Sequence, residues 1–154
     1  MALKVTSAFT FRRRPSAIPA DLRPHWRIAV ILLILSKGSR GQQASLKKLH
    51  VLNWAMKSEQ ARARFRDYCA GLARPDDVII RFEPSLDRAV GFAVAEGLVQ
   101  FEDGRKLSMT DRGRRLAAEV DKSDVLQPEK LFLDEVRTKA TEARIESLLN
   151  WEPQ

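Results

Sequence analysis

The chain has 154 residues, of which 44% are hydrophobic and 31% are charged, and its formal net charge is +7. This length suffices for one compact domain, and the single cysteine, Cys69, excludes an internal disulfide or a metal site built from several thiolates. The most apolar run, residues 28 to 35, is far shorter than the roughly 20 residues that cross a bilayer, so we expect a core helix and no membrane contact.

The charge is distributed unevenly along the chain. Residues 1 to 74 contain 15 Lys and Arg and three acids and carry +12, whereas residues 75 to 154 contain 12 basic and 17 acidic residues and carry −5. This asymmetry predicts a polyanion or another acidic partner for the first half. The alternative is a solvated basic surface that only aids solubility.

Residues 1 to 22 are predicted to form a basic N-terminal arm, either as a short edge strand or as a disordered tail. Pro15 and Pro19 interrupt the apolar stretch that a signal peptide would need, so we expect no export and a cytoplasmic location. The candidates for phosphate contact in this arm are Arg12, Arg13 and Arg14.

Three helices are predicted to follow this arm. Pro24 is acceptable in the first turn of a helix that is apolar on nearly every side and that ends at Gly38. Ser45 is the expected N-cap of the second helix and Ser58 that of the third, which stops before Pro75.

The second and third helices also carry basic side chains beside their buried stripes. Such side chains would bind phosphates with little sequence specificity, and salt would weaken the binding steeply. Trp54 either stacks on a base among these cations or packs into the core, as most large aromatic residues do. The predicted nucleic-acid ligands in this region are Lys47, Lys48, Lys57, Arg62 and Arg66.

A β-branched run at residues 78 to 82 predicts a strand, and Ser85 begins a helix that continues through Glu96. The outward side of this helix is poor in groups that read bases and suits another protein, since interface centres favour aromatic residues and disfavour charge. The alternative is that Phe92 completes the core of the domain. The predicted partner contacts on this helix are Arg88, Gly91, Phe92 and Ala95.

Asp103 and Gly104 predict a two-residue turn between strands at residues 98 to 102 and 105 to 109, because both tolerate positive φ angles. Arg105 and Lys106 beside the turn are candidates for phosphate contact, or they form an ordinary solvated turn. Thr110 is the expected N-cap of the next helix, which continues to about residue 122.

Residues 123 to 154 are predicted to form a C-terminal helical arm, in which one helix runs from Gln127 to about Asn150. This helix has more apolar residues than one buried stripe requires, which suggests that the arm docks onto another molecule. The predicted contacts of the arm are Leu131, Ile145, Leu148, Leu149 and Trp151.

The order of elements over residues 26 to 122 resembles a winged helix domain. The matching segments are AEGLV at 95 to 99, DGR at 103 to 105 and LSMTDRG at 107 to 113. The resemblance implies a mainly α fold with a small β-hairpin, with the winged helix domain at residues 23 to 122, extra N-terminal helices and the C-terminal arm.

A second resemblance is carried by the sequence RPHWRIAVILLILSKGSRGQQASLKKLHVLNWAMKS at residues 23 to 58. This segment is similar to the small middle components of bacterial three-component systems built around an SMC-like ABC ATPase, a group that includes Lamassu-type anti-phage defence. The resemblance implies a non-enzymatic adaptor that joins the ATPase to an effector, with larger protein subunits as partners.

Motifs for catalysis are missing from the sequence. His25 and His50 are its only histidines, and neither stands in an HxxxH or HxE context. The sequence has no GxxxxGK[ST], GxGxxG or GxSxG motif. We therefore expect no enzyme activity, cofactor or small-molecule substrate, and the rival to the adaptor is a stand-alone dimeric winged helix transcriptional regulator that binds DNA.

Overall fold

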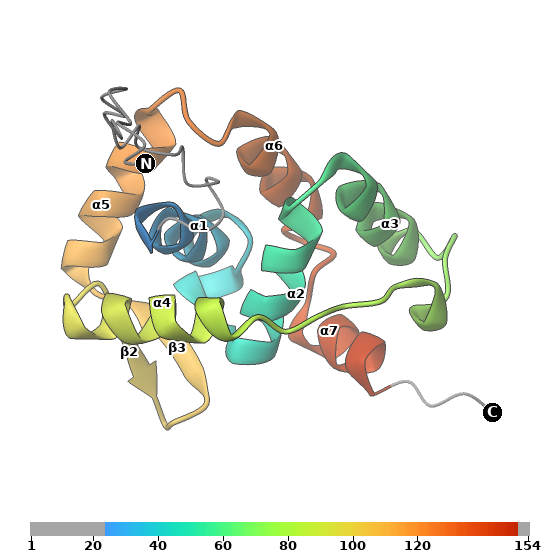
Figure 1. The fold of residues 1–154 in the computed structure, drawn as a ribbon, viewed down its shortest axis with the longest axis horizontal. Coiled ribbons are helices and arrows are strands. Elements are labelled where there is room, and N and C mark those ends of the chain that lie inside the picture. Colours follow the sequence, from blue (N-terminus) through green and yellow to red (C-terminus); the bar gives the residue numbers. More distant parts are fainter. Residues whose placement is uncertain (1–23, 151–154) are drawn as a thin grey trace, which may run out of the picture.

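The computed structural model describes residues 24 to 150 (Figure 1). Its strands are β1 (Gln43–Ser45), β2 (Val99–Glu102) and β3 (Lys106–Met109). Its α-helices are α1 (Pro24–Lys37), α2 (Leu46–Met56), α3 (Glu59–Cys69), α4 (Pro84–Ala95), α5 (Asp111–Lys122), α6 (Gln127–Val136) and α7 (Glu142–Leu149). The predicted mainly α fold is confirmed, whereas the basic arm with Arg12, Arg13 and Arg14 lies outside the described residues.

Helix α1 is the centre of the core. Every residue from Val30 to Leu35 is fully buried, and α2, α4, α5 and α6 pack around the helix, as Figure 1 shows. A helix that is apolar on all sides needs such surroundings, so the predicted core helix is confirmed. None of the helices between residues 24 and 150 has the length and apolar character needed to cross a bilayer.

The predicted helix caps are present. Ser45, Ser58 and Thr110 each accept a hydrogen bond from a backbone N–H in the first turn of α2, α3 and α5, respectively. Each cap satisfies one of the N–H groups that the helix itself leaves without a partner. These short-range signals place the starts of the three helices correctly.

The sheet has one strand more than the predicted hairpin. Strand β3 pairs antiparallel with both β2 and β1, so the order is β1-β3-β2, and Ser45 lies opposite Lys106. Strand β1 contains only Gln43, Ala44 and Ser45, which is too short for an alternating pattern and has no β-branched residue. Its position beside β3 depends on the tertiary fold.

The predicted strand at residues 78 to 82 is wrong. A short 3-10 turn, η3 (Pro75–Asp77), leads into an extended segment that joins no sheet. Val78 is buried and Ile79 is exposed, while the ring of Phe82 stacks on His50 with centroids 4.4 Å apart. Val78 and Phe82 therefore make separate contacts without a neighbouring strand, and Ile79 is left on the surface.

The predicted single C-terminal helix is also wrong, because residues 137 to 141 separate α6 from α7. Thr141 caps α7 by accepting a hydrogen bond from the backbone N–H of Arg144. The hydroxyl of Tyr68 donates to the carbonyl of Arg144 at 3.1 Å, and the guanidinium of Arg144 donates to the carbonyl of Cys69 at 3.1 Å. These bonds attach α7 to the end of α3.

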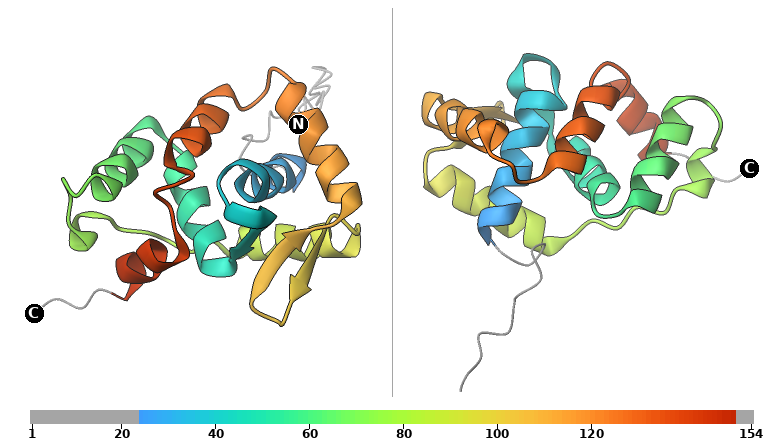
Figure 2. Two further views of the ribbon diagram at one scale, coloured as in Figure 1. Left: turned by 180° about the vertical axis from the view of Figure 1, so that it is seen from behind. Right: turned by 90° about the horizontal axis from the view of Figure 1, so that it is seen from above.

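The C-terminal segment is part of the main core rather than a separate arm. Phe132 and Leu133 of α6 and Ile145 of α7 are buried in the same cluster as α1. Helix α6 packs on α1 and α3, and α7 packs on α2. Figure 2 shows the connection between α6 and α7 running past α2.

Candidate functional site

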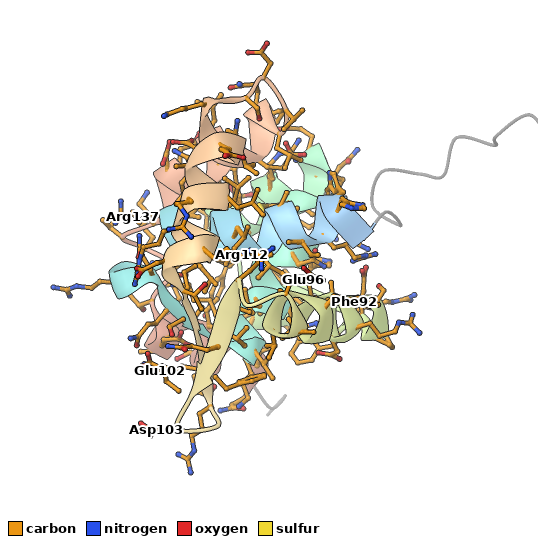
Figure 3. All side chains as sticks on the ribbon, turned by 90° about the vertical axis from the view of Figure 1, so that its left-hand side faces the viewer. Phe92, Glu96, Glu102, Asp103, Arg112 and Arg137 are labelled. Carbon is orange, nitrogen blue, oxygen red and sulfur yellow. The ribbon has the colours of Figure 1, made fainter. Side chains whose placement is uncertain are left out.

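Helix α4 has one buried side and one exposed side. Its buried residues are Leu86, Ala89, Val90 and Ala93. Phe92 is 57% exposed, and Figure 3 shows its ring on the outer side of the helix. Phe92 therefore does not complete the core, and its predicted neighbours on the surface, Arg88, Gly91 and Ala95, are exposed as well.

Phe92 borders a groove of about 800 Å³ between α1, α4 and α5. Helices α1 and α5 also contribute apolar side chains to this groove. The sequence analysis did not indicate these residues as part of a site. The groove has a volume typical of ligand and peptide pockets, and its apolar residues are Ile28, Ala29, Phe92, Leu98, Leu116 and Val120.

The width of this groove depends on how closely α5 approaches the end of α4. A Cβ atom at Gly113 would overlap the carbonyl oxygen of Leu98, so only glycine permits this approach. The hydroxyl of Thr110 donates to the carbonyl of Gly97 at 2.5 Å and accepts from the N–H of Gly113 at 3.1 Å. The TDRG segment therefore fixes one side of the groove.

Charged side chains surround the apolar residues of the groove. Arg112 donates to the carbonyl of Glu96 at 2.9 Å, and its guanidinium lies 3.8 Å from the Glu96 carboxylate. Figure 3 shows Arg112 on α5 close to Glu96 at the end of α4. Arg115 and Glu119 also line the groove and make no ion pair with another described residue, so both are accessible to a molecule that enters it.

Four of the predicted nucleic-acid ligands bind carboxylates of this chain instead. Lys47 pairs with Glu146 at 2.9 Å and Arg66 pairs with Glu135 at 2.7 Å. Lys57 pairs with Glu83. Arg62 is buried and donates to the carbonyl of Met56 and to Glu59, both at 3.0 Å. These pairs do not form a continuous basic surface.

Lys48 is only 3% exposed, so it does not lie on an open phosphate-binding surface. Burial lowers the pKa of its ammonium group, because desolvation disfavours the charged form. Trp54 is partly buried and packs against the core, as the size of its side chain favours. Of the two alternatives for Trp54, the structure supports packing into the core.

The hairpin tip keeps its cations accessible. Asp103 and Gly104 have the expected positive φ angles, 51° and 69°, but the connection has three residues rather than two, because Glu102 lies opposite Lys106. Arg105 and Lys106 are exposed and make no ion pair with a described residue. Figure 3 shows Asp103 at the projecting end of the hairpin, so these two side chains are placed to reach a phosphate chain or a neighbouring protein.

The apolar residues of the C-terminal segment divide into two groups. Ile145 and Leu148 are buried in the core, so the prediction that they contact a partner is wrong. Leu149 is partly buried against the same cluster. Leu131 is 64% exposed on α6, and Trp151 lies outside the described residues.

The histidine and cysteine of the described core make structural contacts. His50 Nε2 lies 2.9 Å from Asp87 Oδ1, which connects α2 to α4. Burial raises the pKa of the Cys69 thiol, with an opposing effect from Arg144. Between residues 24 and 150, no group of three or more His, Cys, Asp and Glu side chains is arranged to hold a metal ion.

Comparisons with protein-family models, with curated proteins and with solved structures give no match for this chain. Function is therefore argued from the groove, the hairpin tip and the distribution of charge.

Proposed function

We propose that the chain is a non-enzymatic adaptor subunit that binds a larger protein through the groove between α1, α4 and α5. The observation that carries this proposal is Phe92, a large apolar side chain 57% exposed at the edge of an apolar groove. Aromatic anchors of this kind, in or beside a pocket, supply much of the binding energy of protein interfaces. The charged rim around the groove matches the polar periphery of such interfaces.

The order of elements supports a winged helix arrangement within this proposal. Helix α1, strand β1, helix α2, helix α4 and the β2–β3 hairpin follow one another, with the sheet order β1-β3-β2. Helix α3 and the extended segment after it are inserted between α2 and α4. In this interpretation α4 is the helix that would read bases in a DNA-binding relative, and the hairpin is the wing.

The exposed side of α4 is unsuited to a DNA groove. Asp87 and Glu96 would face phosphates with negative charge, and Phe92 has no group that bonds to base edges. Arg88 alone offers a guanidinium, while Lys47, Lys57, Arg62 and Arg66 are paired with carboxylates of the chain. Contact with nucleic acid is then weak, independent of sequence and centred on the hairpin tip.

The partner is expected to present an apolar side chain flanked by carboxylates. The apolar group would enter the groove beside Phe92, and the carboxylates would pair with Arg88 and Arg115, which have no ion-pair partner among residues 24 to 150. The sequence resemblance supplies a specific candidate, an SMC-like ABC ATPase that the chain would join to an effector in anti-phage defence.

The substitution Phe92→Asp tests this proposal in co-expression with an SMC-like ATPase of the same cell. A buried charge in the interface should weaken the complex by at least about 30-fold, because loss of an interface hot spot costs about 2 kcal/mol or more. The affinity is measured by biolayer interferometry on purified proteins. Ile79→Asp is the matched control, since Ile79 is also an exposed apolar residue and lies away from the groove.

The proposal requires that Phe92→Asp keeps the circular dichroism spectrum and melting temperature of the original chain. Equal binding by the Phe92 and Ile79 variants would remove the groove from the interface. If Phe92→Asp unfolds the chain, then Phe92 supports the fold, and Arg115→Glu provides the second test of the same groove.

The alternative, a stand-alone DNA-binding regulator, is favoured by the accessible cations of the hairpin tip. A regulator should elute as a dimer and shift one specific DNA fragment, and Arg88→Ala should abolish that shift. The adaptor proposal expects Arg88→Ala to leave DNA affinity nearly unchanged. It also expects the double variant Arg105→Ala, Lys106→Ala to weaken binding equally for all sequences.

A further inference from the structure

A second cavity, of about 680 Å³, lies on another part of the molecule, where four parts of the chain meet. The loop before β1, the start of α2, strand β3 and the connection from α6 to α7 all contribute to its wall. Figure 3 shows Arg137, which lines this cavity, well away from Phe92. This site does not overlap the proposed protein-binding groove.

Basic side chains dominate the wall of this cavity: it is lined by Arg40, Lys48, Lys106 and Arg137, with one acid, Glu142. Glu142 already accepts hydrogen bonds from the backbone N–H of Ser45 at 3.0 Å and from its hydroxyl at 2.7 Å. None of the four cations forms an ion pair or a side-chain hydrogen bond within residues 24 to 150. The cavity therefore has an excess of positive charge.

Lys48 distinguishes this cavity from an ordinary basic surface. The residue is only 3% exposed, yet its ammonium nitrogen is not one of the fully buried polar atoms that lack a partner, so it stays in contact with the space of the cavity. Charges that are largely removed from water are normally paired or hydrogen-bonded in proteins. Glu142 attracts this charge, and Lys106 of strand β3 repels it. An anion in the cavity would pair with both lysines.

We propose that this cavity binds the di- or triphosphate group of a small ligand. Four cations around one space match several phosphate charges better than a single carboxylate, and guanidinium groups such as those of Arg40 and Arg137 suit phosphate oxygens. No aromatic side chain lines the cavity, so recognition rests on the phosphates and not on a stacked base. This inference is independent of the adaptor function.

Isothermal titration calorimetry with inorganic pyrophosphate and with ADP tests the proposal on the full chain. We expect one site per chain for both probes, with affinities within about tenfold of each other, because no residue is available to hold the base by stacking. Clearly tighter binding of ADP would identify the natural ligand as a nucleotide, and equal binding would identify the polyphosphate alone. Absence of binding by both probes at millimolar concentration would overturn the proposal.

The substitution Lys48→Met tests whether Lys48 itself binds the phosphate group. Binding should weaken by about 10-fold to 100-fold, as expected for the loss of a charge-assisted hydrogen bond. The melting temperature without ligand should rise, because a poorly solvated charge is removed, while the increase in melting temperature on adding pyrophosphate should disappear. A purely structural lysine would lower the melting temperature when replaced and would leave binding unchanged.

Lys47→Met is the matched control, since it removes the same charge from the neighbouring position of α2 but does not line the cavity. Equal weakening of pyrophosphate binding by the Lys47 and Lys48 variants would show general charge attraction and refute the site. Binding of a DNA duplex that is lost in Lys48→Met, without binding of pyrophosphate, would assign the cavity to a nucleic-acid backbone instead and contradict the proposal.

Discussion

Gly91 and Gly113 lie inside helices, yet their surroundings differ. Around Gly91 on α4 there is open space, so an added Cβ would meet no atom. At Gly113 on α5 the same Cβ would overlap the carbonyl of Leu98. The first glycine costs helix stability without a packing reason, while the second permits the contact that forms the groove.

We therefore predict opposite effects for two identical substitutions. Gly91→Ala should stabilise the chain by about 0.5 to 1 kcal/mol, which is the usual gain for alanine over glycine in a helix. Gly113→Ala should destabilise it by about 1 to 3 kcal/mol, because the clash with Leu98 must be relieved by backbone movement. Urea unfolding of both variants measures the two values, and a stabilised Gly113 variant would contradict the close approach of α5.

For single residues, the sequence predicts local features such as helix caps well, but it predicts poorly which side chains are buried by distant segments. The caps Ser45, Ser58 and Thr110 were predictable because a cap bonds to its own first turn. The surroundings of Lys48 were not, because Glu142 and Lys106, which act on its charge and line the same cavity, come from distant segments. Spacing along one helix places Lys48 beside Lys47 but does not show which side another segment will cover.

The errors at the level of elements have one physical cause. Residues 78 to 82 have the composition of a strand, but the fold provides no partner edge, and residues 137 to 141 interrupt what periodicity predicts as one helix. In both cases tertiary contacts decide: Phe82 stacks on His50, and Arg144 binds the end of α3. Local propensity is overruled where a long-range contact is available.

Because α7 packs on the core, we expect alanine substitutions at two apolar residues of the C-terminal segment to change the free energy of unfolding by different amounts. Ile145→Ala should lower the free energy of unfolding by about 2 to 5 kcal/mol, because Ile145 is buried in the common core. Leu131→Ala, at an exposed position on α6, should change it by less than about 0.5 kcal/mol. If both substitutions had equal and small effects in thermal or urea unfolding, the prediction of a separate C-terminal arm would be correct after all.

In the whole molecule, part of the uneven charge of the sequence is neutralised by ion pairs between the two halves of the chain. The basic first half and the acidic second half meet in ion pairs between Lys37 and Asp134, Lys47 and Glu146, and Arg66 and Glu135. The asymmetry predicted an external polyanion because a linear sequence does not show that its halves pack on each other. Some of the cations that remain accessible gather at the hairpin tip and around the second cavity.

The sequence predicted part of the candidate site. The outward side of α4 with Phe92 followed from helical spacing and from the lack of base-reading groups. The groove itself did not, because Ile28, Leu116 and Val120 come from two other helices. The groove exists because α5 packs on α1, and no local sequence pattern encodes that packing.

The central claim, that the groove beside Phe92 binds protein, is tested most directly by hydrogen–deuterium exchange of the chain with and without its purified partner. We expect slower exchange in the partner complex at residues 88 to 98 and 112 to 120, and no such change when a DNA duplex is added. Protection of these residues by DNA, or protection by the partner only in segments outside the groove, would contradict it.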